Sequence, residues 1–173
     1  MSLYFELHRV NPEPRLIRRA AEVIRAGGVI AYPTDSCYAL GCHIGDKAAL
    51  DRIRAIYTFL MPATRETPRR LQHDRRRTIG IRVPDHVVPR QLLAELGEPI
   101  MTSTLMLPGD DAPLNDGREI AKRLSNDLDL VLDGGPCGLE PTTVVDLAVQ
   151  PPAVLRVGKG NLGRLGLASA SGP

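Results

Sequence analysis

The stretch that decides the fold reads Gly27-Gly28-Val29-Ile30-Ala31-Tyr32-Pro33-Thr34-Asp35-Ser36-Cys37-Tyr38-Ala39-Leu40-Gly41. Its short apolar run, Val29 to Tyr32, predicts a buried strand, and Pro33 ends the strand because proline cannot donate to a sheet ladder. Thr34 to Cys37 then place four polar or nucleophilic side chains in a turn, before an extended run resumes at Tyr38. Open α/β folds hold ligand sites at such strand ends. Ordinary turns use the same residue types, so the residues alone leave two interpretations open: a binding turn, or a turn that only joins two strands.

The composition is that of a single globular domain. The chain has 173 residues, of which 43% are hydrophobic, and this length allows one domain with a sizeable core. Aromatic residues are few, with two Phe, four Tyr and no Trp, so a nucleic acid would be held by arginine and backbone groups more than by stacked bases. The net charge of +2 identifies no partner, but residues 65–77 carry six arginines against Glu66 and Asp74, a net of +4 that leaves −2 for the rest.

The cysteines and histidines indicate neither a disulfide framework nor a metal site. The three cysteines, Cys37, Cys42 and Cys137, contain no Cys-x-x-Cys motif, and the four histidines show no metal-ligand spacing. The sequence contains no apolar run of about 18 residues and no apolar N-terminal segment of signal-peptide length. We therefore expect a cytoplasmic protein.

Strands and helices are predicted along most of the chain. Strands are expected at Leu3–His8, Val29–Tyr32, Tyr38–Gly41, Ile56–Leu60, Thr78–Val83, Pro99–Thr104, Leu128–Asp133, Thr142–Leu147 and Ala153–Val157, and helices from Asn11 as N-cap to Gly27, from Asp46 to Ala55, at His86–Gly97 and from Asp116 or Gly117 through Leu124. Strands alternate with helices early and pair directly late, which favours an α/β fold with a mixed parallel and antiparallel sheet and flanking helices. We expect one domain over residues 1–160 and a weakly ordered tail over 161–173.

Polar clusters lie at the ends of four predicted strands. They are Thr34-Asp35-Ser36, Thr102-Ser103-Thr104, Pro141-Thr142-Thr143, and Arg156 before Gly158. Hydroxyl and guanidinium groups bind phosphate or carboxylate oxygens, because these oxygens accept hydrogen bonds and carry charge. Arg82 lies among apolar neighbours and needs an anion if it points inward. Taken singly, each cluster is more often a strand end whose polar groups are satisfied within the protein.

Several motifs in their joint order resemble those of a known family. They are Pro33-Thr34-Asp35-Ser36-Cys37-Tyr38-Ala39-Leu40-Gly41, Gly80-Ile81-Arg82-Val83-Pro84, Pro141-Thr142-Thr143-Val144-Val145-Asp146 and Leu155-Arg156-Val157-Gly158. Together they resemble the YrdC-like threonylcarbamoyl-AMP synthase family over residues 3–160. Thr78 to Pro84 and Thr104 to Gly109 are similar to its YciO branch.

The resemblance implies a YrdC-like fold, with a twisted mixed sheet and a concave positive face. It implies ATP with Mg²⁺, L-threonine and bicarbonate as ligands, and threonylcarbamoyl-adenylate and pyrophosphate as products. The adenylate is the activated intermediate for the t6A modification of tRNA. By similarity, the threonine would be held by Thr34, Tyr38 and Arg82, with Arg82 on its carboxylate, and the nucleotide would be contacted by Thr104, Thr143 and Arg156. Such catalysis consists mostly of positioning and charge neutralisation.

The sequence departs from the family pattern in two places. The synthase branch carries Ser-x-Asn where this chain has Thr104 and Met106, so an apolar thioether replaces an amide. A family Lys-x-Arg motif, and the strand and helix that follow it, are missing after Ala55. At the same point a predicted helix runs into a predicted strand without turn residues, although connections usually take about two to six residues. We infer that a segment is omitted near Arg54 to Tyr57; a real deletion at this point would instead leave a damaged site.

Three functions fit these observations. The first is an enzyme that forms threonylcarbamoyl-adenylate, with full or altered activity. The second is a non-catalytic module for tRNA or double-stranded RNA, which would use the arginines Arg69, Arg70, Arg75, Arg76 and Arg77 on a polyanion. The third is a hydrolase or transferase acting on a related carbamoyl-nucleotide.

Overall fold

The computed structural model describes residues 2–44, 81–82, 84–147, 149 and 151–165. The chain divides into two compact units. The first unit joins Met1–Tyr57 to Pro84–Leu139, and the second joins Thr58–Val83 to Glu140–Pro173.

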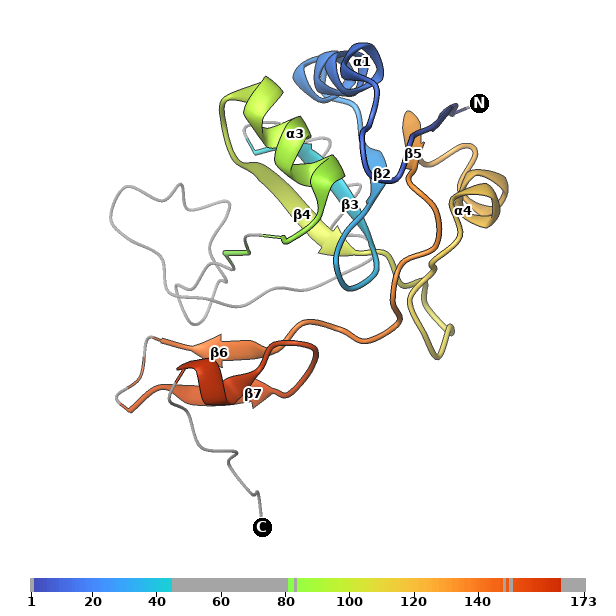
Figure 1. Cartoon of the computed structure of the whole chain (residues 1–173). Helices are drawn as coiled ribbons and strands as arrows, with labels where there is room; N and C mark the ends of the chain where they lie inside the picture. The colour runs from blue at the N-terminus through green and yellow to red at the C-terminus, as the bar shows by residue number, and fades with distance from the viewer. Residues whose placement is uncertain (1, 45–80, 83, 148, 150, 166–173) are drawn as a thin grey trace. The chain divides into compact units, whose positions relative to one another are not determined.

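A five-stranded mixed sheet forms the centre of the first unit (Figure 1). Its strands, in the order in which they lie side by side, are β1 (Leu3–Glu6), β5 (Leu130–Asp133), β2 (Ile30–Pro33), β3 (Tyr38–His43) and β4 (Ile100–Thr104). The pairs β1–β5 and β5–β2 are parallel, whereas β2–β3 and β3–β4 are antiparallel. The prediction of a mixed sheet is confirmed.

The stretch from Gly27 to Gly41 contains β2, the turn after it and most of β3, which pair as a hairpin. Ile30 pairs with Gly41 and Pro33 pairs with Tyr38, so the residues between Pro33 and Tyr38 make the turn. All four residues of β2 are buried. A strand covered on both faces needs a continuous apolar run, and this is the pattern that the sequence shows there.

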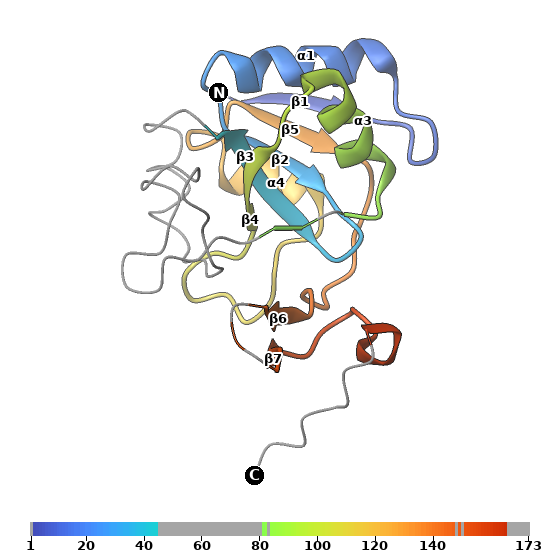
Figure 2. The same cartoon turned by 90° about the vertical axis from the view of Figure 1, so that its left-hand side faces the viewer.

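Helices cover both faces of this sheet (Figure 2). Helix α1 (Pro14–Arg25) and helix α3 (Val87–Leu96) pack on one face, where they share a core with β2, β3 and β5, and α4 (Gly117–Arg123) packs against β5 and β2 from the other side. The residues of α1 that face this core recur at helical spacing; they are Ile17, Ala20, Ala21 and Ile24.

The predicted start of the first helix is wrong. The N-cap of α1 is Glu13, whose side chain makes no capping bond, and Pro14 is the first helical residue. The backbone N–H of Asn11 donates to Nδ1 of His8 at 3.1 Å instead, which keeps the chain non-helical up to Glu13. Proline favours the first helical position because its ring presets the backbone and its missing N–H would lack a partner there anyway.

The second unit contains a two-stranded antiparallel sheet. It consists of β6 (Val144–Asp146) and β7 (Ala153–Arg156), with a register shift between Val144 and Val145. A 3-10 helix, η2, spans Leu162–Leu165. Within the predicted strand Thr78–Val83, Ile81 and Arg82 are described, and both lie outside any strand. The prediction is wrong at these two positions, where the Ile81 side chain is 74% exposed, and the rest of the predicted strand lies outside the described residues.

Among the residues described, no helix is long and apolar enough to cross a membrane.

Candidate functional site

One end of the five-stranded sheet gathers three of the predicted site residues. Because β2 and β5 run parallel, their carboxyl ends meet at this edge, where β3 begins and β4 ends. The turn that starts at Thr34 follows β2, Tyr38 is the first residue of β3, and Thr104 is the last residue of β4. The sheet topology therefore brings Thr34, Tyr38 and Thr104 to a common edge, although Thr104 is 70 positions from Thr34 in the sequence.

The turn between β2 and β3 is closed by hydrogen bonds of Thr34. Its Oγ1 donates to the carbonyl oxygen of Cys37 at 2.6 Å and accepts from the backbone N–H groups of Ser36 and Cys37, each at 3.3 Å. The backbone N–H of Thr34 also donates to the carbonyl oxygen of Cys37, at 3.2 Å. The hydroxyl proton and both acceptor lone pairs of Thr34 Oγ1 are therefore used inside the turn.

The side chains of this turn are mostly buried. Thr34 is 3% exposed, Ser36 1% and Cys37 0%, and Ser36 Oγ lies 3.5 Å from Sγ of Cys37. Asp35 is the residue of the turn that is half-buried rather than buried. The turn is therefore a buried element held by its own hydrogen bonds, with Asp35 as its more exposed side chain.

Tyr38 is fully buried, and its hydroxyl reaches the end of β5. The hydroxyl oxygen lies 3.0 Å from Oδ1 of Asp133 and 3.1 Å from the carbonyl oxygen of Gly135. Asp133 also accepts from the backbone N–H of Gly135 at 2.8 Å and, through Oδ2, from the hydroxyl of Tyr4. Sequence reasoning missed Asp133, which it treated only as the last residue of a strand.

These contacts shift the ionisation of the groups around Asp133. Burial by itself would raise the pKa of Asp133, but hydrogen bonds from Tyr4, Gly135 and Tyr38 outweigh it and hold that pKa below its ordinary value. Burial and the nearby carboxylate raise the pKa of Tyr4 to about 12 and raise the pKa of Tyr38 further. Asp133 is therefore ionised and both tyrosines are neutral donors over the physiological pH range.

Thr104 lies beside the start of β3, and Met106 follows it. Thr104 pairs with Ala39, and the backbone N–H of Leu105 donates to the carbonyl oxygen of Tyr38 at 2.9 Å. Met106 is half-buried, and its backbone N–H donates to the carbonyl oxygen of Thr104 at 3.1 Å. A thioether at position 106 cannot donate to a phosphate as an amide would.

Two further predicted site residues lie at one end of the β6–β7 sheet in the second unit. Thr143 Oγ1 donates to the carbonyl oxygen of Gly160 at 2.8 Å and accepts from the backbone N–H of Gly158 at 3.0 Å. Arg156 donates from Nε to the carbonyl oxygen of Thr142 at 3.0 Å and from a terminal nitrogen to its Oγ1 at 3.3 Å. Their hydrogen bonds join the segment before β6 to the segment after β7.

The remaining predicted site residues are Arg82 and the arginines expected to bind RNA. Arg82 is half-buried and belongs to the second unit. The arginines predicted for RNA binding, Arg69, Arg70, Arg75, Arg76 and Arg77, and the junction near Arg54 to Tyr57 lie outside the described residues. The convergence of the two units' site residues on one ligand stays a prediction.

A cavity of about 240 Å³ lies at the carboxyl ends of β1 and β5. Its lining is polar and of mixed charge; it consists of Glu6, Leu7, Arg9, Asp116, Arg118, Asp133, Gly135 and Pro136. The acidic groups are largely engaged, since Glu6 pairs with Arg118 at 3.7 Å and Asp116 caps α4. No group of three or more His, Cys, Asp or Glu residues in the described part of the chain could hold a metal ion.

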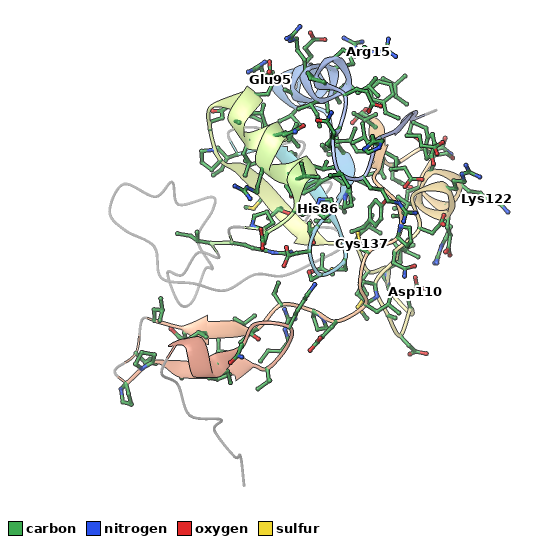
Figure 3. The ribbon with its side chains drawn as sticks, in the orientation of Figure 1. Arg15, His86, Glu95, Asp110, Lys122 and Cys137 are labelled. Carbon is green, nitrogen blue, oxygen red and sulfur yellow. The ribbon has the colours of Figure 1, made fainter. Side chains whose placement is uncertain are left out.

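Cys137 lies in the segment that follows β5 (Figure 3). Burial raises the pKa of its thiol to about 11, although a hydrogen bond with the backbone of Thr34 lowers that pKa in part. The segment after β5 thus touches the turn after β2 from a second direction.

The fold and the polar turn at its sheet edge define a YrdC-like α/β protein. A family model of the Sua5/YciO/YrdC proteins, described as telomere recombination, matches residues 22–57 and 55–158. The crystal structure of Escherichia coli YciO superposes with a TM-score of 0.86 at 40% identity, over 94% of this chain and 98% of that one. An uncharacterized protein of Haemophilus influenzae is 43% identical over 93% of this chain and 98% of its own length. The chain belongs to the Sua5/YciO/YrdC family, and both the YrdC-like fold and the YciO resemblance are confirmed.

More distant relatives carry a functional name. A threonylcarbamoyl-AMP synthase of Chromobacterium violaceum is 30% identical over 142 positions, covering 58% of this chain and 73% of that protein. P. abyssi Sua5 complexed with L-threonine has the same fold, with a TM-score of 0.82 at 23% identity over 95% of this chain and 60% of that one.

The relatives contain positions that have no counterpart in this chain. The alignment with the Haemophilus influenzae relative spans 202 positions, whereas 93% of this chain's 173 residues is about 161, so about 40 positions have no counterpart here. The two pieces of the family match meet at residues 55–57, where the predicted helix runs into the predicted strand.

Proposed function

We propose that this protein binds L-threonine and ATP and, with bicarbonate, forms threonylcarbamoyl-adenylate and pyrophosphate. Membership in a family with relatives named threonylcarbamoyl-AMP synthase supports the reaction class. The observation that carries the proposal is the closed, buried turn from Thr34 to Cys37, held at the same sheet edge as Thr104. A rigid turn at a strand end is suited to orienting a small substrate.

The roles of the predicted residues follow from the chemistry of the substrates. A threonine carboxylate calls for a guanidinium, which Arg82 supplies, and Thr34 closes the turn that would hold the rest of the substrate. Thr104, Thr143 and Arg156 supply hydroxyl and guanidinium donors for phosphate or ribose oxygens, and Mg²⁺ would accompany the ATP phosphates. These groups position and neutralise charge, which is what phosphoryl-centre chemistry needs from a protein.

The proposed reaction balances without a redox step. The threonine nitrogen forms a bond to the bicarbonate carbon and water leaves, which gives a carbamate. A carbamate oxygen then bonds to the α-phosphorus of ATP as the α–β bridging bond breaks, and pyrophosphate leaves. The product would be the activated intermediate that a partner transfers to tRNA for t6A.

Pyrophosphate release tests the proposal directly. The purified chain should release pyrophosphate from ATP only when both threonine and bicarbonate are present, and chromatography should show the adenylate in equal amount. An Arg82→Ala variant should raise the KM for threonine roughly ten- to hundredfold, since hydrogen bonds to charged groups contribute about 1.5–3 kcal/mol. The matched control is Arg90→Ala, because Arg90 is an exposed arginine of α3 that pairs with Asp85 at 3.7 Å.

The amide at position 106 can be restored in the same assay. A Met106→Asn variant should increase the rate if the amide aids the phosphates. Pyrophosphate release that does not depend on threonine or on bicarbonate would contradict the proposal.

An RNA-binding module is the second candidate, and the six arginines of residues 65–77 favour it. If it is correct, affinity for tRNA or double-stranded RNA will fall steeply with added salt and will fall again when Arg75, Arg76 and Arg77 become alanine. Filter binding at two salt concentrations measures both effects. Equal affinity for a neutral polymer would contradict this function.

A further inference from the structure

The carboxylate of Asp133 is the meeting point of two tyrosines and a backbone turn. Its Oδ2 accepts from Tyr4 in the edge strand β1, and its Oδ1 accepts from Tyr38 at 3.0 Å and from the N–H of Gly135 at 2.8 Å. Gly117 of α4 closes the site, since a Cβ there would lie 2.5 Å from Cγ of Asp133. The carboxylate is therefore held from four sides.

Tyr38 connects this carboxylate to the turn that carries the proposed threonine contact. It is the residue immediately after the turn, and its backbone pairs with Pro33, the residue immediately before it. Its side chain is fully buried, so the ring cannot change position without disturbing the sheet edge. The hydroxyl contact with Asp133 thus fixes the base of the turn.

The segment after β5 supports the same turn at two more points. A Cβ added at Gly134 would lie 2.9 Å from Cγ of Pro33, so the two segments are in direct contact. The thiol of Cys137 is hydrogen-bonded to the backbone of Thr34. The segment after β5 is itself held in place, because Asp133 ends a buried strand and the backbone N–H of Gly135 donates to the Asp133 carboxylate.

The geometry points to Asp133 as a positioning residue for threonine: through the Tyr38 hydroxyl it holds the Thr34–Cys37 turn in its binding conformation. This role rests on the proposed function, because it assumes that the turn binds threonine. Asp133 touches no reacting atom and acts through Tyr38.

Steady-state kinetics of four single variants and one double variant tests this role. Tyr38→Phe removes the hydroxyl that links Asp133 to the turn, and Asp133→Ala removes the acceptor. Each should raise the KM for threonine about tenfold, in line with the loss of one hydrogen bond to a charged group, while kcat and the KM for ATP stay within about twofold. Asp133→Asn keeps an acceptor oxygen for Tyr38 and should restore a threonine KM close to wild type.

Tyr4→Phe is the matched control. It removes a hydroxyl from the same carboxylate on the side of β1, away from the turn, and should leave the threonine KM unchanged. The double variant Tyr38→Phe/Asp133→Ala should have a threonine KM no higher than that of Asp133→Ala alone, because both changes break the same hydrogen bond. If Asp133→Ala does not fold, Tyr38→Phe and Asp133→Asn carry the test.

The outcomes separate the two proposals. If the wild-type chain releases pyrophosphate but Tyr38→Phe keeps its threonine KM, or if Tyr4→Phe raises it equally, the positioning role of Asp133 is wrong and the proposed function stands. If the wild-type chain neither releases pyrophosphate nor gives heat with threonine in calorimetry, the proposed function fails and the positioning role fails with it.

Discussion

The hydroxyl of Tyr38 lies 3.0 Å from a carboxylate oxygen of Asp133, a residue 95 positions further along the chain. The contact exists because β5 is inserted next to β2 in the sheet, so that the end of a late strand meets the turn after an early one. It joins the most recognisable motif of the sequence to a residue that belongs to none of the motifs.

Stability should fall as the pH rises through the alkaline range. The pKa of Cys137 is raised to about 11 and that of Tyr4 to about 12, both above the values of the unfolded chain. Groups that are held neutral in the folded state contribute stability below the unfolded pKa, and this contribution is lost as the pH rises through the folded pKa. We expect the urea midpoint to decline between about pH 9 and pH 12.

The Tyr4→Phe variant isolates one of these contributions. The difference in urea midpoint between wild type and Tyr4→Phe should be largest below about pH 10 and should shrink toward pH 12. Tyrosinate absorbance should show titration of Tyr4 near pH 12. A difference that is constant with pH would contradict the pKa shift.

A methyl group at Gly117 should destabilise the first unit. Gly117 is buried at the start of α4, and its Cβ would lie 2.5 Å from Cγ of Asp133, a group fixed by three donors. Overpacking of this kind costs about 1–3 kcal/mol, so Gly117→Ala should lower the free energy of unfolding by about 2 kcal/mol in urea. The neighbouring Arg118→Ala, at an exposed position, should change it by less than about 0.5 kcal/mol.

Gly97 should resist substitution for a different reason. It ends α3 with φ +73°, and nothing lies within 4 Å of an added Cβ. The cost of Gly97→Ala is therefore backbone strain alone, about 1 kcal/mol. Gly97→Asn should lose less stability than Gly97→Ala, since asparagine tolerates the left-handed region of backbone conformation. An alanine variant as stable as wild type in thermal unfolding would show that α3 ends differently.

The N-cap of α4 offers a third stability test. Oδ1 of Asp116 accepts from the backbone N–H of Glu119 at 2.8 Å. Replacing an N-cap by alanine costs about 1 kcal/mol, whereas asparagine is a comparable cap. Asp116→Ala should therefore lower the urea midpoint and Asp116→Asn should leave it nearly unchanged, and equal loss in both variants would mean that the charge of Asp116 matters more than the cap.

Local patterns predicted most of the elements. The apolar run before Pro33, the helix ending at Gly97 and the helix starting at Asp116 or Gly117 each depend on residues a few positions apart, and all three are confirmed. The wrong prediction of Asn11 as N-cap also has a cause nearby in the sequence. Pro14 favours the first helical position, which excludes a helix start three residues earlier.

Residues of the candidate site were predictable from the sequence only where they belong to a sequence motif. Thr34, Tyr38 and Thr104 were selected from patterns, and the sheet topology brings them to one edge. Asp133, Gly117 and Arg9 were missed because their partners are distant in sequence: Arg9 packs on Gly135, and Gly117 on Asp133. The one available signal was that carboxyl ends of parallel strands gather polar groups.

The pairing of β1 with β5 has a consequence for how the protein is made. Leu3 pairs with Leu130, so the first strand of the chain waits for 127 further residues before its neighbour exists. At about 5–20 residues per second of translation, the wait is roughly 6 to 25 s. During biosynthesis Tyr4 has no Asp133 to bind, and a half-apolar strand stays unpaired on the ribosome. Cellular yield is therefore expected to depend on holdase chaperones more than the modest length of the chain would imply.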